Sequence, residues 1–154
     1  MHPSDRDDLY AERSENLEHW VRDMESKVLY LADLLEIYPA SELLEDPRLA
    51  IAYMDELYEC EHIEELDDAN FAKVFSVLLS FVGYYLIRKF DGHWEVDADR
   101  ESPSYARYLV CLPDPHSDSE VCIDIGERVN EFLHEPVGRS FLRFLIRLEG
   151  LVAP

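Results

Sequence analysis

Apolar residues recur every three or four positions through the first quarter of the chain. Their spacings alternate between four and three, which is the heptad pattern of a helix with one buried stripe. The stripe consists of Leu17, Val21, Met24, Val28, Leu31, Leu35 and Tyr38. It predicts a helix from about Ser14, or from as early as Asp5, to Ile37, and Pro39 ends it. The stripe can pack in the chain's own core or form a homodimer through residues 17–38.

A second helix is predicted to begin at Asp46-Pro47. Aspartate is a favoured N-cap residue, and proline is favoured at the first helical position. The apolar residues that follow recur at helical spacing and form the predicted inward face, which leaves the acidic side chains in solvent. They are Leu49, Ala52, Tyr53, Leu57 and Cys60.

A third helix is predicted over about residues 69–89, with Asp67 or Asp68 as its N-cap. It is apolar around most of its circumference, which is typical of a helix at the centre of a fold. Its uncharged run of 14 residues, 74–87, is shorter than the roughly 20 residues that cross a bilayer. Glycine costs about 1 kcal/mol relative to alanine inside a helix, so Gly83 predicts a close neighbour at that point.

Three short segments rich in aromatic and β-branched residues predict strands at 93–97, 105–112 and 120–125. Helices over 126–134 and 137–149 follow, on either side of Pro136. The sequence therefore predicts an α+β fold, mainly a helical bundle packed on a small, about three-stranded antiparallel sheet. Residues 1–154 are expected to form a single domain. Its acidic helical part is 1–65, and 66–154 holds the central helix, the β-meander and the C-terminal helices.

Negative charge is concentrated at one end of the sequence. The net charge is −20, and residues 1–70 hold 21 acids against 5 bases. A surface of this kind repels nucleic acid and anionic lipid and attracts cationic proteins. The partner is therefore predicted to be a basic protein, with no direct nucleic-acid binding and no membrane. The predicted partner-binding residues lie in the base-free stretch 49–72 and are Asp55, Glu56, Glu59, Glu61, Glu64, Glu65, Asp67 and Asp68. The alternative is a solvated face that keeps the protein soluble.

The three cysteines do not have the spacing of a metal site or of a paired framework. No basic start followed by an apolar run marks a secretory signal. Free thiols in the reducing cytoplasm are the expectation, with Cys111 and Cys122 as small buried hydrophobic residues. No cofactor and no metal ion is predicted.

One group of polar residues could carry chemistry. In an up-down-up meander, the start of the first strand lies near the end of the second strand and the start of the third. This topology would gather imidazoles and carboxylates at one rim, where they could bind a divalent metal or serve as acid and base. The residues are His93, Asp114, His116, Asp118 and Glu120, of which His93, His116 and Asp118 are the catalytic candidates. The chain contains none of the common hydrolase, metalloprotease or nucleotide-binding motifs, so a catalyst is the less favoured class.

The last predicted helix carries a basic stripe. Arg139, Arg143 and Arg147 recur every four residues. Arginine suits phosphate and carboxylate through its planar fork, so an anion site is one interpretation. Pairing with the chain's own surplus of carboxylates is the simpler expectation.

Residues 83–94 form a helix end, a glycine turn and a tryptophan that opens a strand, and a further strand and a short helix follow. This arrangement, over about a third of the chain, resembles small uncharacterised bacterial α+β domains of the toxin-immunity type. The resemblance implies a partner-binding protein. Such domains share no catalytic residues, so it assigns no role to a particular position.

The leading hypothesis is therefore a non-enzymatic acidic binding protein that neutralises or regulates a basic partner. It would act in the manner of an immunity protein or inhibitor, and its charge could imitate that of a nucleic acid. Attraction between opposite charges would speed association, and Tyr53, Tyr58 or Tyr10 would anchor the partner. Two alternatives stay open: a small metal-dependent or acid–base enzyme that uses the His93 rim, and a dimeric structural subunit.

Overall fold

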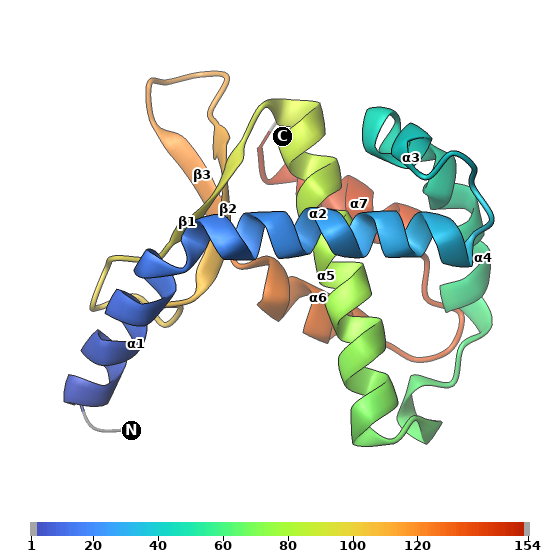
Figure 1. The fold of residues 1–154 in the computed structure, drawn as a ribbon, viewed down its shortest axis with the longest axis horizontal. Coiled ribbons are helices and arrows are strands. Elements are labelled where there is room, and N and C mark those ends of the chain that lie inside the picture. Colours follow the sequence, from blue (N-terminus) through green and yellow to red (C-terminus); the bar gives the residue numbers. More distant parts are fainter. Residues whose placement is uncertain (1–2, 153–154) are drawn as a thin grey trace.

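The computed structural model describes residues 3–152. It is mainly helical with one three-stranded antiparallel sheet, which confirms the predicted α+β fold class (Figure 1). The longer helices are α1 (Pro3–Glu15), α2 (Leu17–Leu34), α3 (Ser41–Glu45), α4 (Ile51–Cys60), α5 (Asp68–Phe90), α6 (Ile125–Leu133) and α7 (Phe141–Gly150). The strands are β1 (His93–Val96), β2 (Tyr108–Pro113) and β3 (Glu120–Ile123), and two short 3-10 helices are η1 (Pro47–Ala50) and η2 (Ile63–Glu65).

The centre of the fold is the crossing of α2 and α5 (Figure 1). Asp67 caps α5 by accepting a hydrogen bond from the Asn70 amide at 2.8 Å. Within residues 3–152, α5 is the one helix that length and composition alone would allow to cross a membrane. Its residues from Leu78 to Leu86 are nevertheless almost all buried in the core. The prediction that this segment is a central core helix is therefore confirmed.

The predicted first helix is two helices, because the chain bends at Asn16. The amide side chain of Asn16 donates to the Glu12 carbonyl at 2.9 Å and occupies a backbone acceptor near the end of α1. The stripe is confirmed only at its centre, where Met24, Val28 and Leu31 are buried in the chain's own core.

The predicted inward face of the second helix is wrong. Met54 and Tyr58 are buried on α4, whereas Leu49, Tyr53 and Leu57 are exposed. Both rows have a spacing of four residues, so periodicity alone does not choose between them. The segment starts with the tighter 3-10 turn η1, and packing on α7 then fixes which row is covered.

The sheet has the strand order β1-β2-β3. One face packs on the core through Trp94, Val110, Leu112 and Ile123, and residues with the opposite parity form the outer face. A β-carbon at Gly83 would overlap the Trp94 indole, so the predicted close neighbour of this glycine is confirmed. The second strand starts three residues later than predicted, because 102–107 form turns in which Ala106 has a positive φ of 67°.

Arg139, just before α7, joins the ends of α4 and α6 from the inside. Its side chain is buried, and its guanidinium donates to the carbonyl oxygens of Tyr58 (2.9 Å), Glu61 (2.7 Å) and Glu135 (2.7 Å). The expected carboxylate partner is therefore wrong for Arg139, since its acceptors are backbone oxygens where α4 and α6 end. It is right for Arg147, which pairs with Glu135 at 3.0 Å.

Candidate functional site

The predicted acidic residues follow α4, η2 and the start of α5. Six of them are exposed, and Asp55 and Glu61 are half-buried. Two of them also hold helix ends. Asp67 is the N-cap of α5, and Asp55 accepts hydrogen bonds from Ser140 Oγ (3.2 Å) and the Leu142 amide (3.1 Å) at the start of α7. The other six carboxylates therefore have the freer side chains for a partner, and a binding role for all eight stays a prediction.

Large apolar side chains lie near these acids on the outward side of η1 and α4. They are Leu49, Tyr53 and Leu57, at exposed fractions of 42%, 56% and 50%, and we call them the α4 stripe. Their spacing of four residues places them in one row, with Glu56 and Glu59 on the same exposed side of the helix. The sequence marked these positions as apolar and periodic but not as solvent-facing.

Tyr53 is the one fully exposed residue among the three tyrosines predicted to anchor a partner. Tyr58 is buried, and burial, assisted by the nearby Glu61 charge, raises the pKa of its phenol far above the usual value. Tyr10 stacks on Tyr105 with ring centroids 5.7 Å apart. Tyr53 can therefore anchor a partner as it stands. Tyr58 could do so only if the fold rearranged around it.

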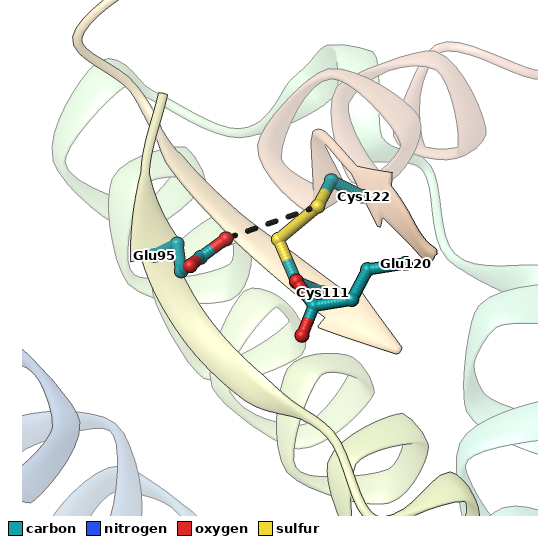
Figure 2. A group of neighbouring side chains, drawn as sticks. All are labelled: Glu95, Cys111, Glu120 and Cys122. Atoms are coloured by element: carbon teal, nitrogen blue, oxygen red, sulfur yellow. Dashed lines mark hydrogen bonds between the residues drawn. A yellow bond between two sulfur atoms is a disulfide. The ribbon is translucent and has the colours of Figure 1, made fainter. Parts of the chain in front are cut away.

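The outer face of the sheet carries a second constellation. The strand register places His93 opposite Cys111 and Cys111 opposite Cys122, so a histidine and two cysteines form one row across the three strands. Glu95 of β1 and Glu120 of β3 lie on either side of the cysteines (Figure 2). The side chains of His93, Glu95 and Glu120 are 43–49% exposed, so solvent reaches this row.

Cys111 and Cys122 form a disulfide, and the prediction that they are free thiols is wrong. Their Cα atoms are 4.1 Å apart because the two residues face each other across β2 and β3. Cys111 is buried as predicted, whereas Cys122 is exposed, and Cys60 is a free, exposed cysteine. The argument from free thiols to the cytoplasm therefore fails, and the cytoplasmic location stays a prediction.

Carboxylate and imidazole groups crowd around the disulfide. His93 Nε2 lies 3.3 Å from Glu95 Oε1 and 3.8 Å from Glu120 Oε1. Glu95 Oε2 lies 3.9 Å from Cys122 Sγ, the approach that the dashed line marks in Figure 2. A disulfide sulfur has no proton to donate, so this contact becomes a hydrogen bond only when Cys122 is a thiol.

The predicted rim of the sheet is only partly assembled. His93 and Glu120 come together, as the meander topology predicts. Asp114 instead accepts hydrogen bonds from the His116 amide (2.9 Å) and Ser117 Oγ (3.1 Å), within the loop between β2 and β3. His116 and Asp118 are exposed in that loop. The chemistry on this face therefore centres on the His93–Cys111–Cys122 row.

A cavity lies elsewhere, as an open cleft of about 800 Å³ lined in part by Trp20, Phe75 and Tyr108. Its charged groups include Arg107 and Asp124, which pair at 3.0 Å. Asp124 also caps α6 by accepting from the Glu127 amide. Both charges are thus already engaged in contacts that stabilise the fold.

Comparison of the chain with models of protein families, with curated protein sequences and with solved structures finds no match. The resemblance of residues 83–94 to toxin-immunity domains therefore stays a prediction.

Proposed function

We propose that this protein binds a basic partner protein through the exposed face of α4, with the α4 stripe as the anchor and the surrounding carboxylates as the charged rim. The observation that carries the proposal is the α4 stripe itself, three large apolar side chains in one row within the base-free stretch 49–72. Exposed apolar rows rimmed by polar groups are typical of protein interaction sites.

Charge selects the kind of partner. No lysine or arginine lies between Arg48 and Lys73, so a facing surface rich in cations gains attraction without a local competitor. A second copy of the chain fits less well. A twofold contact through the α4 stripe would bring Glu56 and Glu59 close to the same acids of the other copy. The electrostatics therefore favour a different, basic protein, which this chain would neutralise or regulate.

The sequence offers a matched pair of variants for the test. Tyr53→Ser with Leu57→Ser removes two members of the α4 stripe. Tyr30→Ser with Leu34→Ser makes the same change at the same spacing on α2, where the side chains are 55% and 57% exposed. The α2 pair lies in a segment that also contains Arg22 and Lys27, outside the base-free stretch.

The experiment compares three immobilised baits in lysate of the native host at low salt: wild type, the α4 variant and the α2 variant. We expect a basic protein that wild type and the α2 variant retain and the α4 variant loses. Once that protein is purified, the α4 variant should bind it with a dissociation constant at least roughly 30-fold higher than that of wild type. This corresponds to a loss of about 2 kcal/mol of binding free energy, which is typical of an interface anchor. The association rate should fall steeply between about 0.05 and 0.5 M salt.

Several results would overturn the proposal. The α4 variant could retain the same proteins as wild type, or both variants could lose them equally. Wild type could retain no basic protein. Light scattering could also show a dimer that the α4 variant converts to a monomer, which would make the occupant a second copy of this chain.

A further inference from the structure

We infer that the outer face of the sheet is a thiol-gated zinc site, in which reduced Cys111 and Cys122 bind Zn²⁺ together with His93 and a carboxylate. The disulfide is the form of this site that cannot bind the metal. The inference is independent of the proposed function, because it concerns the sheet, at the other end of α2 from α4 (Figure 1).

The strand register provides the ligands. His93, Cys111 and Cys122 are paired neighbours on β1, β2 and β3, so all three side chains leave the same face of the sheet. Possible ligand atoms of Glu95, Cys111, Glu120 and Cys122 lie within 4.8 Å of one another. His93 is outside this group of four but lies next to both of its carboxylates, 3.3 Å from Glu95 and 3.8 Å from Glu120. Three adjacent strands thus present four donor groups to one small volume, with the His93 imidazole beside the two carboxylates.

The spacing of the donors suits a tetrahedral ion. Bonds of about 2.0 Å to nitrogen or oxygen and about 2.3 Å to sulfur give ligand-to-ligand distances of roughly 3.3–3.8 Å. His93 Nε2 lies 3.8 Å from Glu120 Oε1, and Glu95 Oε2 lies 3.9 Å from Cys122 Sγ. The two sulfurs lie closer than this because the disulfide bond joins them. The site therefore requires that this bond breaks and that the His93 ring moves toward the freed thiolates.

The donor set selects the metal. Two thiolates and an imidazole favour zinc over the oxygen-loving magnesium and calcium ions. Glu120 or Glu95 completes the four ligands. The second carboxylate then lies beside His93, where it can hold the imidazole in the orientation that binding needs.

The gating step balances as a thiol–disulfide exchange. A dithiol reductant attacks the Cys111–Cys122 bond, transfers two electrons and two protons to the pair, and is itself oxidised to a disulfide. Zn²⁺ then displaces the two thiol protons and binds the thiolates. In the reverse direction, a disulfide oxidant takes two electrons from the thiolates, the Cys111–Cys122 bond forms again, and Zn²⁺ is released.

The test uses the full chain without a histidine tag, in oxidised form and after reduction with a phosphine that is removed under nitrogen. Co²⁺ is the spectroscopic probe, because thiolate ligands give an intense near-ultraviolet charge-transfer band, and Zn²⁺ affinity is measured against a chromophoric chelator. We expect one equivalent of metal and the thiolate band in the reduced protein. The oxidised protein should bind at least roughly 100-fold more weakly, because it has lost both thiolates.

Variants assign the ligands. Cys122→Ser should remove most of the thiolate band. His93→Ala, which keeps both cysteines, should weaken Zn²⁺ binding by at least the roughly 10–100-fold that loss of a supporting group costs. Cys60→Ser and His116→Ala are the controls outside the row and should match wild type. The inference is overturned if the reduced protein binds no stoichiometric metal, if oxidised and reduced forms bind equally, or if His93→Ala and His116→Ala behave alike.

Discussion

The buried guanidinium of Arg139 gives the sharpest test of how this fold is held together. Arg139 is 4% exposed and has four hydrogen bonds to three backbone carbonyls, at 2.7–3.1 Å. These carbonyls lie where α4 and α6 end, and helix ends of this kind carry partial negative charge. We predict that Arg139→Met destabilises the protein far more than the same change at Arg143 or Arg147.

The size of the effect follows from what the substitution leaves behind. Methionine keeps much of the aliphatic stem, so little packing is lost, but the three carbonyls lose their donor. A buried carbonyl left without its donor costs about 1–3 kcal/mol, so the loss of the donor to all three should cost at least about 3 kcal/mol. Arg139→Lys retains the charge but not the planar fork, so an intermediate loss of about 1.5–3 kcal/mol is expected, the value of a single hydrogen bond to a charged group.

Arg143 and Arg147, which follow Arg139 on the basic stripe, supply the controls. Arg143 is exposed, so Arg143→Met should change the free energy of unfolding by no more than about 0.5 kcal/mol. Arg147, 61% exposed, pairs with Glu135, and its loss should cost about 0–1 kcal/mol. Urea unfolding followed by circular dichroism gives all four values. If Arg139→Met and Arg143→Met differed by less than about 1 kcal/mol, the reasoning from the buried guanidinium would be refuted.

Two further predictions concern the core. Gly83→Ala should lower the free energy of unfolding by about 1–3 kcal/mol in urea titrations, because the new methyl group overlaps Trp94. Gly126→Ala is the helical control. Its new methyl group meets no atom closer than 3.5 Å, so this variant should not be destabilised. Burial raises the pKa of Tyr58, so above about pH 10 the unfolded chain loses that proton while the folded protein keeps it. Stability is then intact below that pH and falls above it by up to about 1.4 kcal/mol per pH unit. Tyr58→Phe should make this alkaline decline in the urea midpoint shallower, whereas Tyr30→Phe on an exposed face should leave it unchanged.

The class of each element was predictable because local pattern determines it. The periodicity of α5, the Asp67 cap and the alternating strands all act over a few residues, and all are present. The orientation of α4 was not predictable in the same way. Its two apolar rows, Tyr53 with Leu57 and Met54 with Tyr58, are equally periodic, and only packing on α7 distinguishes them.

The candidate sites depended on register and on long-range contacts. A hairpin whose turn is centred between His116 and Ser117 pairs residues equally distant from that centre, as Cys111 and Cys122 are. The predicted strands were therefore compatible with a Cys111–Cys122 disulfide. The pairing could be predicted only if the position of the turn between the strands was known. Arg139 contacts two carbonyls about 80 residues away in sequence. Every residue has a backbone carbonyl, so the sequence does not show which ones act as acceptors.

Arg139 also bears on how a stretch of chain with eight acids and no bases stays folded. Its charge lies behind α4 and η2, bound to the carbonyls of Tyr58 and Glu61 within that stretch. Its field reaches the surface as well: the amide of Glu64 itself, the His62 ring and, more weakly, the charge of Arg139 lower the pKa of the Glu64 carboxyl. A cation placed inside the fold offsets part of the repulsion among the acids without occupying their exposed side chains. The same arrangement that stabilises this segment thus leaves most of its carboxylates exposed, as the proposed binding of a basic partner requires.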